Sequence, residues 1–191
     1  ALRGLAVELG RVANDLRLLA SGPRTGLAEI TVPAIAPGSS IMPGKVNPSL
    51  LEMLNMVCYQ VIGCDLALCG AAQAGQLELN VMMPVVAFNL HLMIEIIGNA
   101  VEQVRTKCVE GIRADEKRCR EYAENSLGLA TALSPRLGYA RAADIAREAL
   151  KRNKTIRAIA REKGILDRAE AERLLDLRKL TEPFGQAATP G

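Results

Sequence analysis

The residues best suited to chemistry lie in one short segment, Gly38–Pro48, which is rich in glycine and proline. Ser39 and Ser40 carry hydroxyl groups that can act as a nucleophile or a base once neighbouring groups activate them. Lys45 brings a positive charge to the same segment, and positive charge attracts an anionic ligand. The segment therefore combines a reactive oxygen with a place for negative charge.

Two glycines in the segment, Gly38 and Gly44, allow a ligand to approach the backbone closely. A helix is predicted to begin at Ser49, and the backbone N–H groups at a helix start favour an anion. Glu52 follows one turn into that helix. Composition alone leaves two interpretations open, a solvated surface loop or a binding site for a negatively charged ligand.

The elements that must position this segment are predicted to be helical. The chain has 191 residues, of which 49% are hydrophobic, and this is enough for a real core in one or two domains. Apolar residues recur at helical spacing over residues 1–20, and Ser21-Gly22-Pro23 ends the pattern. Residues 22–48 hold four glycines and five prolines, which leaves room only for a short strand at 29–32. A structureless stretch of this length in a compact protein is usually functional.

Two long apolar helices are predicted after the loop. The first covers 49–74, with Ser49 as its N-cap, and is expected to be deeply buried. The second covers 77–108, and Pro84 is expected to kink it without ending it. At a rise of 1.5 Å per residue it would extend about 50 Å, the full width of a chain this size. Its apolar arc covers about half the circumference or more, so we predict a helical bundle shared between subunits.

The composition changes between Glu110 and Asp115, after which the predicted helices are shorter and more charged. They are expected at 115–124, 140–152, 155–163 and 168–175, and the tail at 181–191 is expected to be frayed. The predicted fold class is thus all-α. A long-helix bundle domain at 1–110 contains the loop at 37–48, and a small helical domain follows at 111–191.

Composition and charge argue against several classes of function. The net charge of +3 is spread along the chain without a basic block, so we expect no nucleic-acid binding. The longest uncharged stretch, Leu79–Ile94, is short and contains polar residues, so we expect no membrane span. One histidine, His91, and five cysteines without a Cys-x-x-Cys pair predict neither a metal nor a cofactor. The cysteines instead indicate buried thiols in a reducing compartment, the cytoplasm.

The start of the chain favours a piece of a longer protein. There is no initiator Met, and Ala1 leads directly into a helical pattern without a capping residue. No charged-then-apolar leader precedes that helix, so secretion is not expected.

The eleven residues Gly38-Ser-Ser-Ile-Met-Pro-Gly-Lys-Val-Asn-Pro48 resemble the signature of the fumarase/aspartase superfamily. The resemblance covers essentially the whole chain, because four further segments also resemble the family. They are Gly22-Pro-Arg-x-Gly26, Gln76-Leu-Glu-Leu-Asn-Val81, Asn125-Ser-Leu127 and Leu137-Gly-Tyr139.

This resemblance implies a reversible anti elimination across the carbon–carbon bond of a succinyl-type substrate, which gives fumarate. It implies that Ser39 is the base, and that Lys45 and Asn47 hold a substrate carboxylate by charge and by an amide hydrogen bond. Glu52 matches a site glutamate that orients Lys45 or a residue of a partner. The supporting residues of the loop are Gly38, Ser40 and Gly44.

The family's other two site regions lie upstream in its complete members and are absent from this chain. Family members assemble each site from three subunits of a tetramer. The resemblance therefore implies a small dicarboxylate substrate and a homotetramer with shared active sites, to which this chain contributes one of three shares.

Within the superfamily, Gly75-Gln-Leu-Glu-Leu-Asn80 is similar to aspartases, whereas fumarases usually carry Gly-Asn-Phe-Glu-Leu-Asn. Other positions do not agree with this, because Met83 departs from both groups and Thr131-Ala-Leu133 is similar to fumarases. We therefore expect elimination of ammonia from L-aspartate, with hydration of fumarate as the alternative. A second alternative is a helical assembly element without activity.

Overall fold

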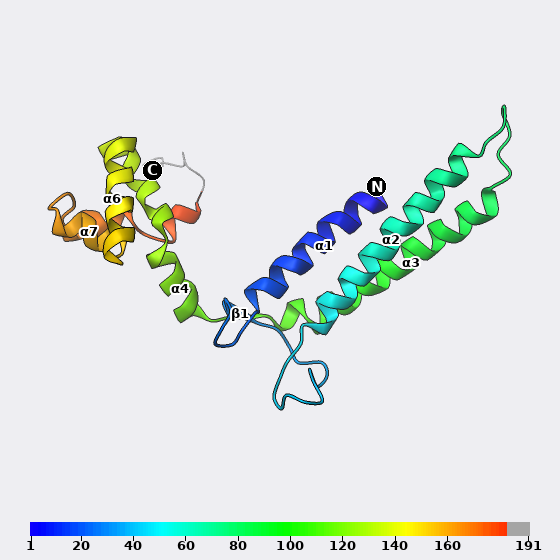
Figure 1. The fold of residues 1–191 in the computed structure, drawn as a ribbon, viewed down its shortest axis with the longest axis horizontal. Coiled ribbons are helices and arrows are strands. Elements are labelled where there is room, and N and C mark those ends of the chain that lie inside the picture. Colours follow the sequence, from blue (N-terminus) through cyan, green and yellow to red (C-terminus); the bar gives the residue numbers. More distant parts are fainter. Residues whose placement is uncertain (183–191) are drawn as a thin grey trace, which may run out of the picture. The chain divides into compact units, whose positions relative to one another are not determined.

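The computed structural model describes residues 1–182 of the chain (Figure 1). These residues form two compact units, one from Ala1 to Asp115 and one that begins at Glu116. Each unit has a hydrophobic core of its own and is described by itself below. Helices dominate both units, and the strands in the described residues have only two residues each, which confirms the all-α fold class.

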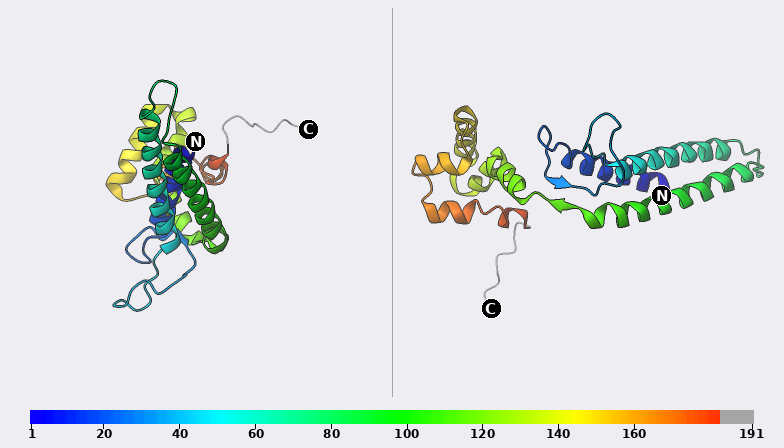
Figure 2. Two further views of the ribbon diagram at one scale, coloured as in Figure 1. Left: turned by 90° about the vertical axis from the view of Figure 1, so that its right-hand side faces the viewer. Right: turned by 90° about the horizontal axis from the view of Figure 1, so that it is seen from below.

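The first unit is built on three long helices. They are α1 (Leu2–Leu19), α2 (Ser49–Gln73) and α3 (Met83–Lys107). Figures 1 and 2 show α2 and α3 side by side as an antiparallel pair, with α1 along α2. The predicted helices at 1–20 and 49–74 are thus confirmed to within two residues at each end.

Small residues on one face of α1 bring it close to α2. Ala6 and Ala13 are fully buried in the core of this unit. A Cβ atom on Gly10, between them, would lie within 4 Å of Asn55 and Cys58 on α2. Residues spaced by three or four share one face of a helix, so these three positions form a flat strip on which α2 packs.

A short antiparallel ribbon holds the start of the loop. Strand β1 (Ile30–Thr31) pairs with β2 (Arg113–Ala114), with Ile30 opposite Ala114. The N–H of Asp115 adds a bond of 2.8 Å to the carbonyl of Glu29. The strand predicted at 29–32 is therefore present but shorter. Its partner was not predicted, because two residues are too few for a periodic pattern.

The helix predicted from Leu77 is wrong in its first turns, because α3 begins only at Met83. Gln76 and Leu79 exchange backbone hydrogen bonds of 2.9 and 3.1 Å, which makes a tight turn there. Leu77 within this turn has a positive φ of 52°. The 25 residues of α3 extend about 37 Å, less than the predicted 50 Å.

Asn80 explains why the two long helices separate at this turn. Its side-chain nitrogen donates to the carbonyl of Ala71 at 2.9 Å, and its side-chain oxygen accepts from the N–H of Met82 at 2.8 Å. It therefore binds backbone groups at the end of α2 and just before α3. Pro84 lies in the first turn of α3, where its missing N–H costs nothing, so the predicted kink does not occur.

The predicted capping role of Ser49 is also wrong. The residue at the N-cap position of α2 is Pro48, and no side-chain cap hydrogen bond forms there. The Ser49 hydroxyl instead donates to the carbonyl of Asn47 at 3.5 Å.

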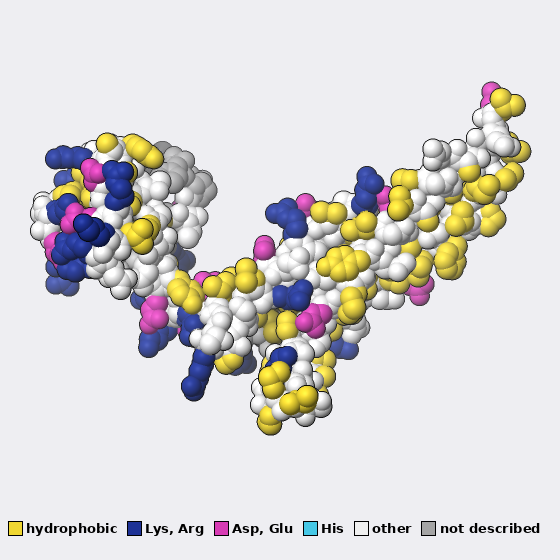
Figure 3. Space-filling model, in the orientation of Figure 1, with side chains coloured by type: hydrophobic (Ala, Val, Ile, Leu, Met, Phe, Trp, Pro, Cys, Tyr) yellow, Lys and Arg dark blue, Asp and Glu magenta, His cyan; other side chains and the backbone are white. Residues whose placement is uncertain are grey.

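Large apolar side chains remain exposed along α2 and α3 within this chain. Figure 3 shows hydrophobic side chains spread over the surface of both helices. On α2 they are Met56, Tyr59, Ile62 and Leu66, and on α3 they include Val85, Phe88, Leu90 and Ile94. The expected deep burial of α2 is thus not complete within one chain. Two segments, Ser49–Gln73 and Met83–Gly111, are long and apolar enough to cross a membrane by length and composition alone. The sequence did not predict them as membrane spans, because charged residues such as Glu52 and Asp65 interrupt their apolar stretches.

The second unit is a cluster of short helices around its own core. They are α4 (Glu116–Asn125), α5 (Ser134–Leu137), α6 (Tyr139–Arg152), α7 (Ile156–Glu162) and α8 (Arg168–Leu174). Turns of 3-10 helix occur at Val109–Gly111 in the first unit and at Leu127–Leu133 and Lys179–Thr181 in the second. The core includes Leu133, Ile145, Ile156, Ile159 and Leu175.

The four helices predicted in this unit are present with bounds that differ by at most one residue at each end. Their ends carry recognisable signals, since the Thr155 hydroxyl caps α7 and Asp167 forms a capping box with Glu170 on α8. Asn153 ends α6 in the left-handed conformation. The segment from Leu127 to Leu137 was not predicted, although the Ser126 hydroxyl caps its first turn by accepting from the N–H of Gly128, and Gly138 ends it with a positive φ. The predicted frayed tail at 181–191 falls almost wholly outside the described residues.

Arg157 ties three helices of this unit together. Its guanidinium makes a double hydrogen bond to Glu124 on α4, at 3.0 and 3.2 Å. It also donates to the carbonyls of Ala171 and Leu175 at the end of α8, at 3.0 and 2.7 Å. A planar guanidinium on α7 thereby binds the end of α8, where it adds to the intrahelical hydrogen bond that Ala171 accepts from Leu175 and also binds the carbonyl of Leu175.

Candidate active site

The loop that carries Ser39 and Lys45 is anchored at both of its ends. Before it, β1 is held by β2, and Pro33 packs tightly against Gly111, where an added Cβ would lie 2.4 Å from the proline ring. After it, Pro48 leads into α2. Its glycine and proline content prevents regular structure, so the loop depends on a few specific bonds for its shape.

Two hydrogen bonds close the loop at its base, and both involve Gly38. The N–H of Gly38 donates to the carbonyl of Lys45 at 2.9 Å. The side-chain amide of Asn47 donates to the carbonyl of Gly38 at 2.8 Å. A Cβ atom on Gly38 would lie 2.4 Å from the Lys45 carbonyl oxygen, so glycine is required for this close approach. We call Gly38, Lys45 and Asn47 the loop neck.

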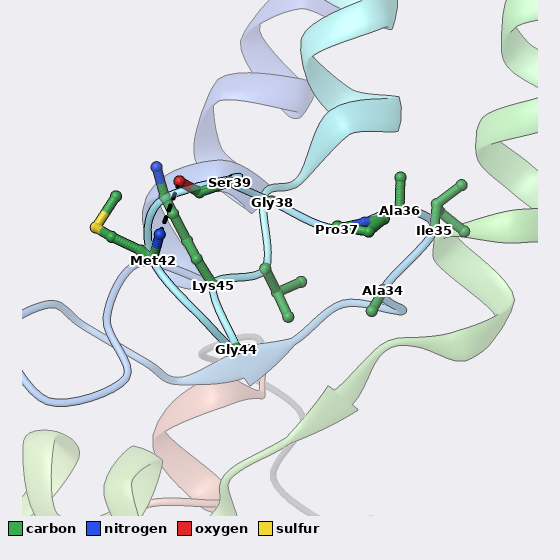
Figure 4. A pocket seen from close by; sticks show the side chains of 10 residues that line it. Ala34, Ile35, Ala36, Pro37, Gly38, Ser39, Met42, Gly44 and Lys45 are labelled. Atoms are coloured by element: carbon green, nitrogen blue, oxygen red, sulfur yellow. Dashed lines mark hydrogen bonds between the residues drawn. The ribbon is translucent and has the colours of Figure 1, made fainter.

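Two backbone N–H groups donate hydrogen bonds to the Ser39 hydroxyl. Its oxygen accepts hydrogen bonds from the N–H groups of Ile41 and Met42, each at 3.1 Å, and Figure 4 shows the bond from Met42. Two N–H donors aimed at one oxygen stabilise negative charge on it. The local turn thus favours the deprotonated, alkoxide form of this serine, which is the form that can act as a base.

A tight turn follows, and it requires a glycine. The N–H of Lys45 donates to the carbonyl of Met42 at 3.3 Å, which closes a four-residue turn. Pro43 and Gly44 take its central positions, and Gly44 has a φ of +77°. This is the pattern of a type II turn, with proline first and a positive-φ glycine second. The turn brings the chain back from Met42 to the neck at Lys45.

The loop encloses an open pocket of about 290 Å³, lined by residues between Ala34 and Val46. Ser39 and Lys45 supply the polar side chains of its lining, and the others are apolar or glycine. In Figure 4 the Lys45 side chain extends along the side of the loop on which Ser39 lies. Ser39 is half-buried, whereas Lys45 and Ser40 are exposed. This arrangement presents one activated oxygen and one cation to a small anion.

Glu52 does not pair with Lys45, although the sequence comparison allowed that role. Within the described residues, the Glu52 carboxylate instead forms an ion pair with Arg17 of α1, at 3.7 Å. Arg17 also donates to Asn14 at 3.4 Å, and its Nε atom is buried without a partner. In the amide orientation that satisfies its neighbours, the side-chain oxygen of the buried Asn55 accepts a hydrogen bond from Arg17 at 3.0 Å. Glu52 is thus held at the α1–α2 contact, next to the loop in sequence.

The structure brings together most of the predicted site residues. Ser39, Lys45 and Asn47 lie in one closed loop with Gly38 and Gly44, and Glu52 lies in the first turn of α2, which follows. Sequence reasoning missed Arg17, and it missed that the donors to Ser39 are the N–H groups of Ile41 and Met42. A serine two residues before a backbone N–H is a known turn pattern, so the second omission could have been avoided. No group of three metal-ligating side chains occurs within residues 1–182.

Two parts of the chain match known protein families. Residues 1–63 match the model of a lyase family, and residues 129–182 match the model of the fumarase C carboxyl terminus. The first match contains the complete loop with Ser39 and Lys45. The second covers most of the small helical unit.

Individual relatives match nearly the whole chain. The aspartate ammonia-lyase of Helicobacter pylori is 51% identical over 182 residues, which is 95% of this chain and 39% of the relative. A crystal structure described as fumarate lyase:delta crystallin from Brucella melitensis, bound to cobalt, has 50% identity and a TM-score of 0.86 over 95% of this chain and 39% of that one. The class II fumarase of Schistosoma mansoni has 38% identity and a TM-score of 0.89, over 96% and 38%. The chain therefore spans about two fifths of the length of these relatives.

Proposed function

Because this chain belongs to the fumarase/aspartase superfamily as a carboxyl-terminal part, we propose that the full-length protein eliminates ammonia from L-aspartate to give fumarate. The identity of 51% to an aspartate ammonia-lyase, against 38% to a fumarase, supports this substrate. So does the segment Gly75-Gln-Leu-Glu-Leu-Asn80, which is similar to aspartases.

The observation that carries the elimination chemistry of the proposal, apart from the choice of leaving group, is the environment of Ser39. A serine is a weak base, and it needs groups that stabilise its negative charge before it can take a proton from carbon. The two N–H donors from Ile41 and Met42 provide this within a four-residue segment. Glycine and proline at the following turn keep those donors in place.

The proposed reaction uses the groups of the loop in sequence. Ser39 first loses its hydroxyl proton to solvent, and the resulting alkoxide takes the proton from the carbon beside one carboxylate while the electron pair of that C–H bond moves toward the carboxylate. The resulting dianion is stabilised by the positive charge of Lys45 and by N–H donors. The electron pair then forms the carbon–carbon double bond as the C–N bond breaks and ammonia leaves. No cofactor is needed for these steps.

The rest of the site comes, in this proposal, from segments beyond this chain. The exposed apolar faces of α2 and α3 support a homotetramer, since a bundle shared between subunits would cover them. On this basis α2 and α3 are core helices and do not span a membrane. Burial raises the pKa of the Cys58 and Cys108 thiols, and such inert reduced thiols support a cytoplasmic protein.

A second candidate is hydration of fumarate to malate. The match of residues 129–182 to the fumarase C carboxyl terminus and the Thr131-Ala-Leu133 segment favour it. Malate and aspartate share both carboxylates and the proton to be removed, so Ser39 and Lys45 serve either reaction. The leaving group is the only difference, and it is recognised elsewhere.

The test is the Ser39→Ala variant of the full-length protein. We expect fumarate formation from L-aspartate to fall by about 10²- to 10⁴-fold, because a general base is lost, while the oligomeric state is unchanged. Ser134→Ala, in α5 of the small unit, serves as a matched control and should keep its turnover. A Ser39→Ala protein that retains more than about a tenth of normal turnover would show that another group is the base.

A further inference from the structure

The loop neck joins the two residues that the proposed reaction needs. Gly38 directly precedes Ser39, and its N–H is bonded to Lys45. Its carbonyl is bonded to the side chain of Asn47. The N–H and the carbonyl of Gly38 are thus both hydrogen-bonded, the first to Lys45 and the second to Asn47. Any change in the neck alters the distance between the Ser39 oxygen and the Lys45 side chain.

Few other bonds hold the loop. Ile41, Met42 and Gly44 are exposed, and the bonds inside the loop are the turn at Lys45 and the two donors to Ser39. Asn47 is half-buried and lies next to the start of α2. Among the described contacts, its side chain makes the side-chain hydrogen bond across the neck, to the carbonyl of Gly38. A bond from a rigid helix start to a flexible loop restricts the loop more than a bond within it.

We infer that Asn47 is a positioning residue that clamps the loop neck and thereby fixes Ser39 relative to Lys45. The effect of the clamp on catalysis rests on the proposed function. The existence of the clamp is independent of that function. It adds to the role that the family resemblance implies for Asn47, which is contact with a substrate carboxylate.

The hydrogen-bonding capacity of the Asn47 side chain limits how far it can serve both roles. An amide nitrogen has two N–H donors, and one of them is committed to Gly38. At most one donor remains for a substrate oxygen, and the amide oxygen would repel a carboxylate. Losing the side chain therefore frees the neck even when no substrate is present.

The experiment measures hydrogen exchange in the full-length protein without ligand. The amides of Gly38, Ile41 and Met42 report directly on the neck and on the donors to Ser39. In Asn47→Ala and Asn47→Asp we expect these amides to exchange about tenfold faster, because a hydrogen bond is lost. Asn99→Ala, on an exposed position of α3, is the matched control and should leave them unchanged.

A second variant reaches the neck from its other side. Gly38→Ala places a Cβ atom against the Lys45 carbonyl, so it should open the neck without removing any side chain that could contact substrate. We expect it to speed exchange of the Ile41 and Met42 amides as the Asn47 variants do. Unchanged exchange in Asn47→Ala would overturn the inference, whatever the activity of that variant.

Kinetics separate the clamp from substrate binding. A misplaced base lowers turnover, so Asn47→Ala and Gly38→Ala should both lower kcat for L-aspartate by about 10- to 100-fold. Because Gly38→Ala removes no side chain that could contact substrate, its KM should stay within about threefold of normal. A raised KM with normal kcat and normal exchange would make Asn47 a substrate ligand alone. If the unmodified protein does not act on L-aspartate, the proposed function fails, while the exchange result still decides the clamp.

Discussion

Single residues decide the chemistry of this loop because each has one conformational or bonding property that its neighbours lack. The Ser39 oxygen is the only side-chain atom of the described loop that receives two backbone N–H bonds. Gly38 fits at the neck because it has no Cβ, and Gly44 fits at the turn because of its positive φ. The position of the Ser39 oxygen, the base in our proposal, therefore depends on two glycines that have no side chain to take part in the reaction.

Gly44 offers a prediction at this scale. An L-residue with φ of +77° is strained, and asparagine tolerates this conformation better than alanine does. We expect kcat/KM for L-aspartate in the full-length protein to fall in the order Gly44, Gly44→Asn, Gly44→Ala. Steady-state assays of the three proteins measure it, and an alanine variant as active as the unmodified protein would show that the turn is not needed.

From the sequence, the loop's chemistry can be proposed but its geometry cannot. Residue types and the eleven-residue resemblance predict Ser39, Lys45 and Asn47 as site residues, and this stays a prediction. Which backbone groups donate to Ser39, and the bond from Asn47 to Gly38, depend on how the chain turns at Pro43 and Gly44. Glu52 shows the same limit, because its pairing with Arg17 joins residues 35 positions apart and no local pattern encodes it.

At the scale of elements, helices with strong local signals were predicted well and turns without such signals were not. The spacing of apolar residues predicted α1 and α2, and the shorter, more charged helical patterns after Asp115 predicted α7 and α8, whose starts Thr155 and Asp167 cap in the structure. The start of α3 was misplaced because Asn80 bonds to backbone groups of both flanking segments, which composition cannot reveal. The pairing of β1 with β2 is likewise a long-range contact.

Arg157 carries the prediction for the small helical unit. It is 24% exposed, and its loss would remove this partner from the Glu124 carboxylate and from the carbonyl of Leu175 at the end of α8. We expect Arg157→Met to lower the free energy of unfolding of this unit by about 1–3 kcal/mol. Denaturant titration followed by circular dichroism measures it.

The matched control is Arg168→Met, since Arg168 forms an exposed pair with Glu172 one turn away on α8. Exposed pairs of this kind contribute little, so its effect should stay below about 0.5 kcal/mol. Equal losses in the two variants would contradict the role of Arg157 as the tie between α4, α7 and α8.

At the scale of the whole molecule, the described chain carries a well-formed loop but also large uncovered apolar surfaces on α2 and α3. Helices of this composition are stable when further helices cover them. The chain also spans only 39% of the length of an aspartate ammonia-lyase to which it is similar. In our proposal, the substrate therefore meets groups from other segments that complete the site around Ser39.

We accordingly predict that a preparation of these 191 residues alone has no lyase activity. The physical reason is that Ser39 and Lys45 can supply a base and a charge, but cannot by themselves enclose the substrate and exclude water. Fumarate absorbance in a preparation checked by intact mass measures this. Steady release of fumarate from L-aspartate by the pure chain would contradict it.

The central claim concerns the leaving group, and one comparison tests it most directly. The full-length protein is assayed with L-aspartate and with L-malate under matched conditions, with fumarate formation as the common readout. An ammonium group and a hydroxyl need different partners, and a site built for one can reject the other by several powers of ten. The account predicts a higher kcat/KM for L-aspartate. A higher kcat/KM for L-malate would contradict it and establish the fumarase alternative.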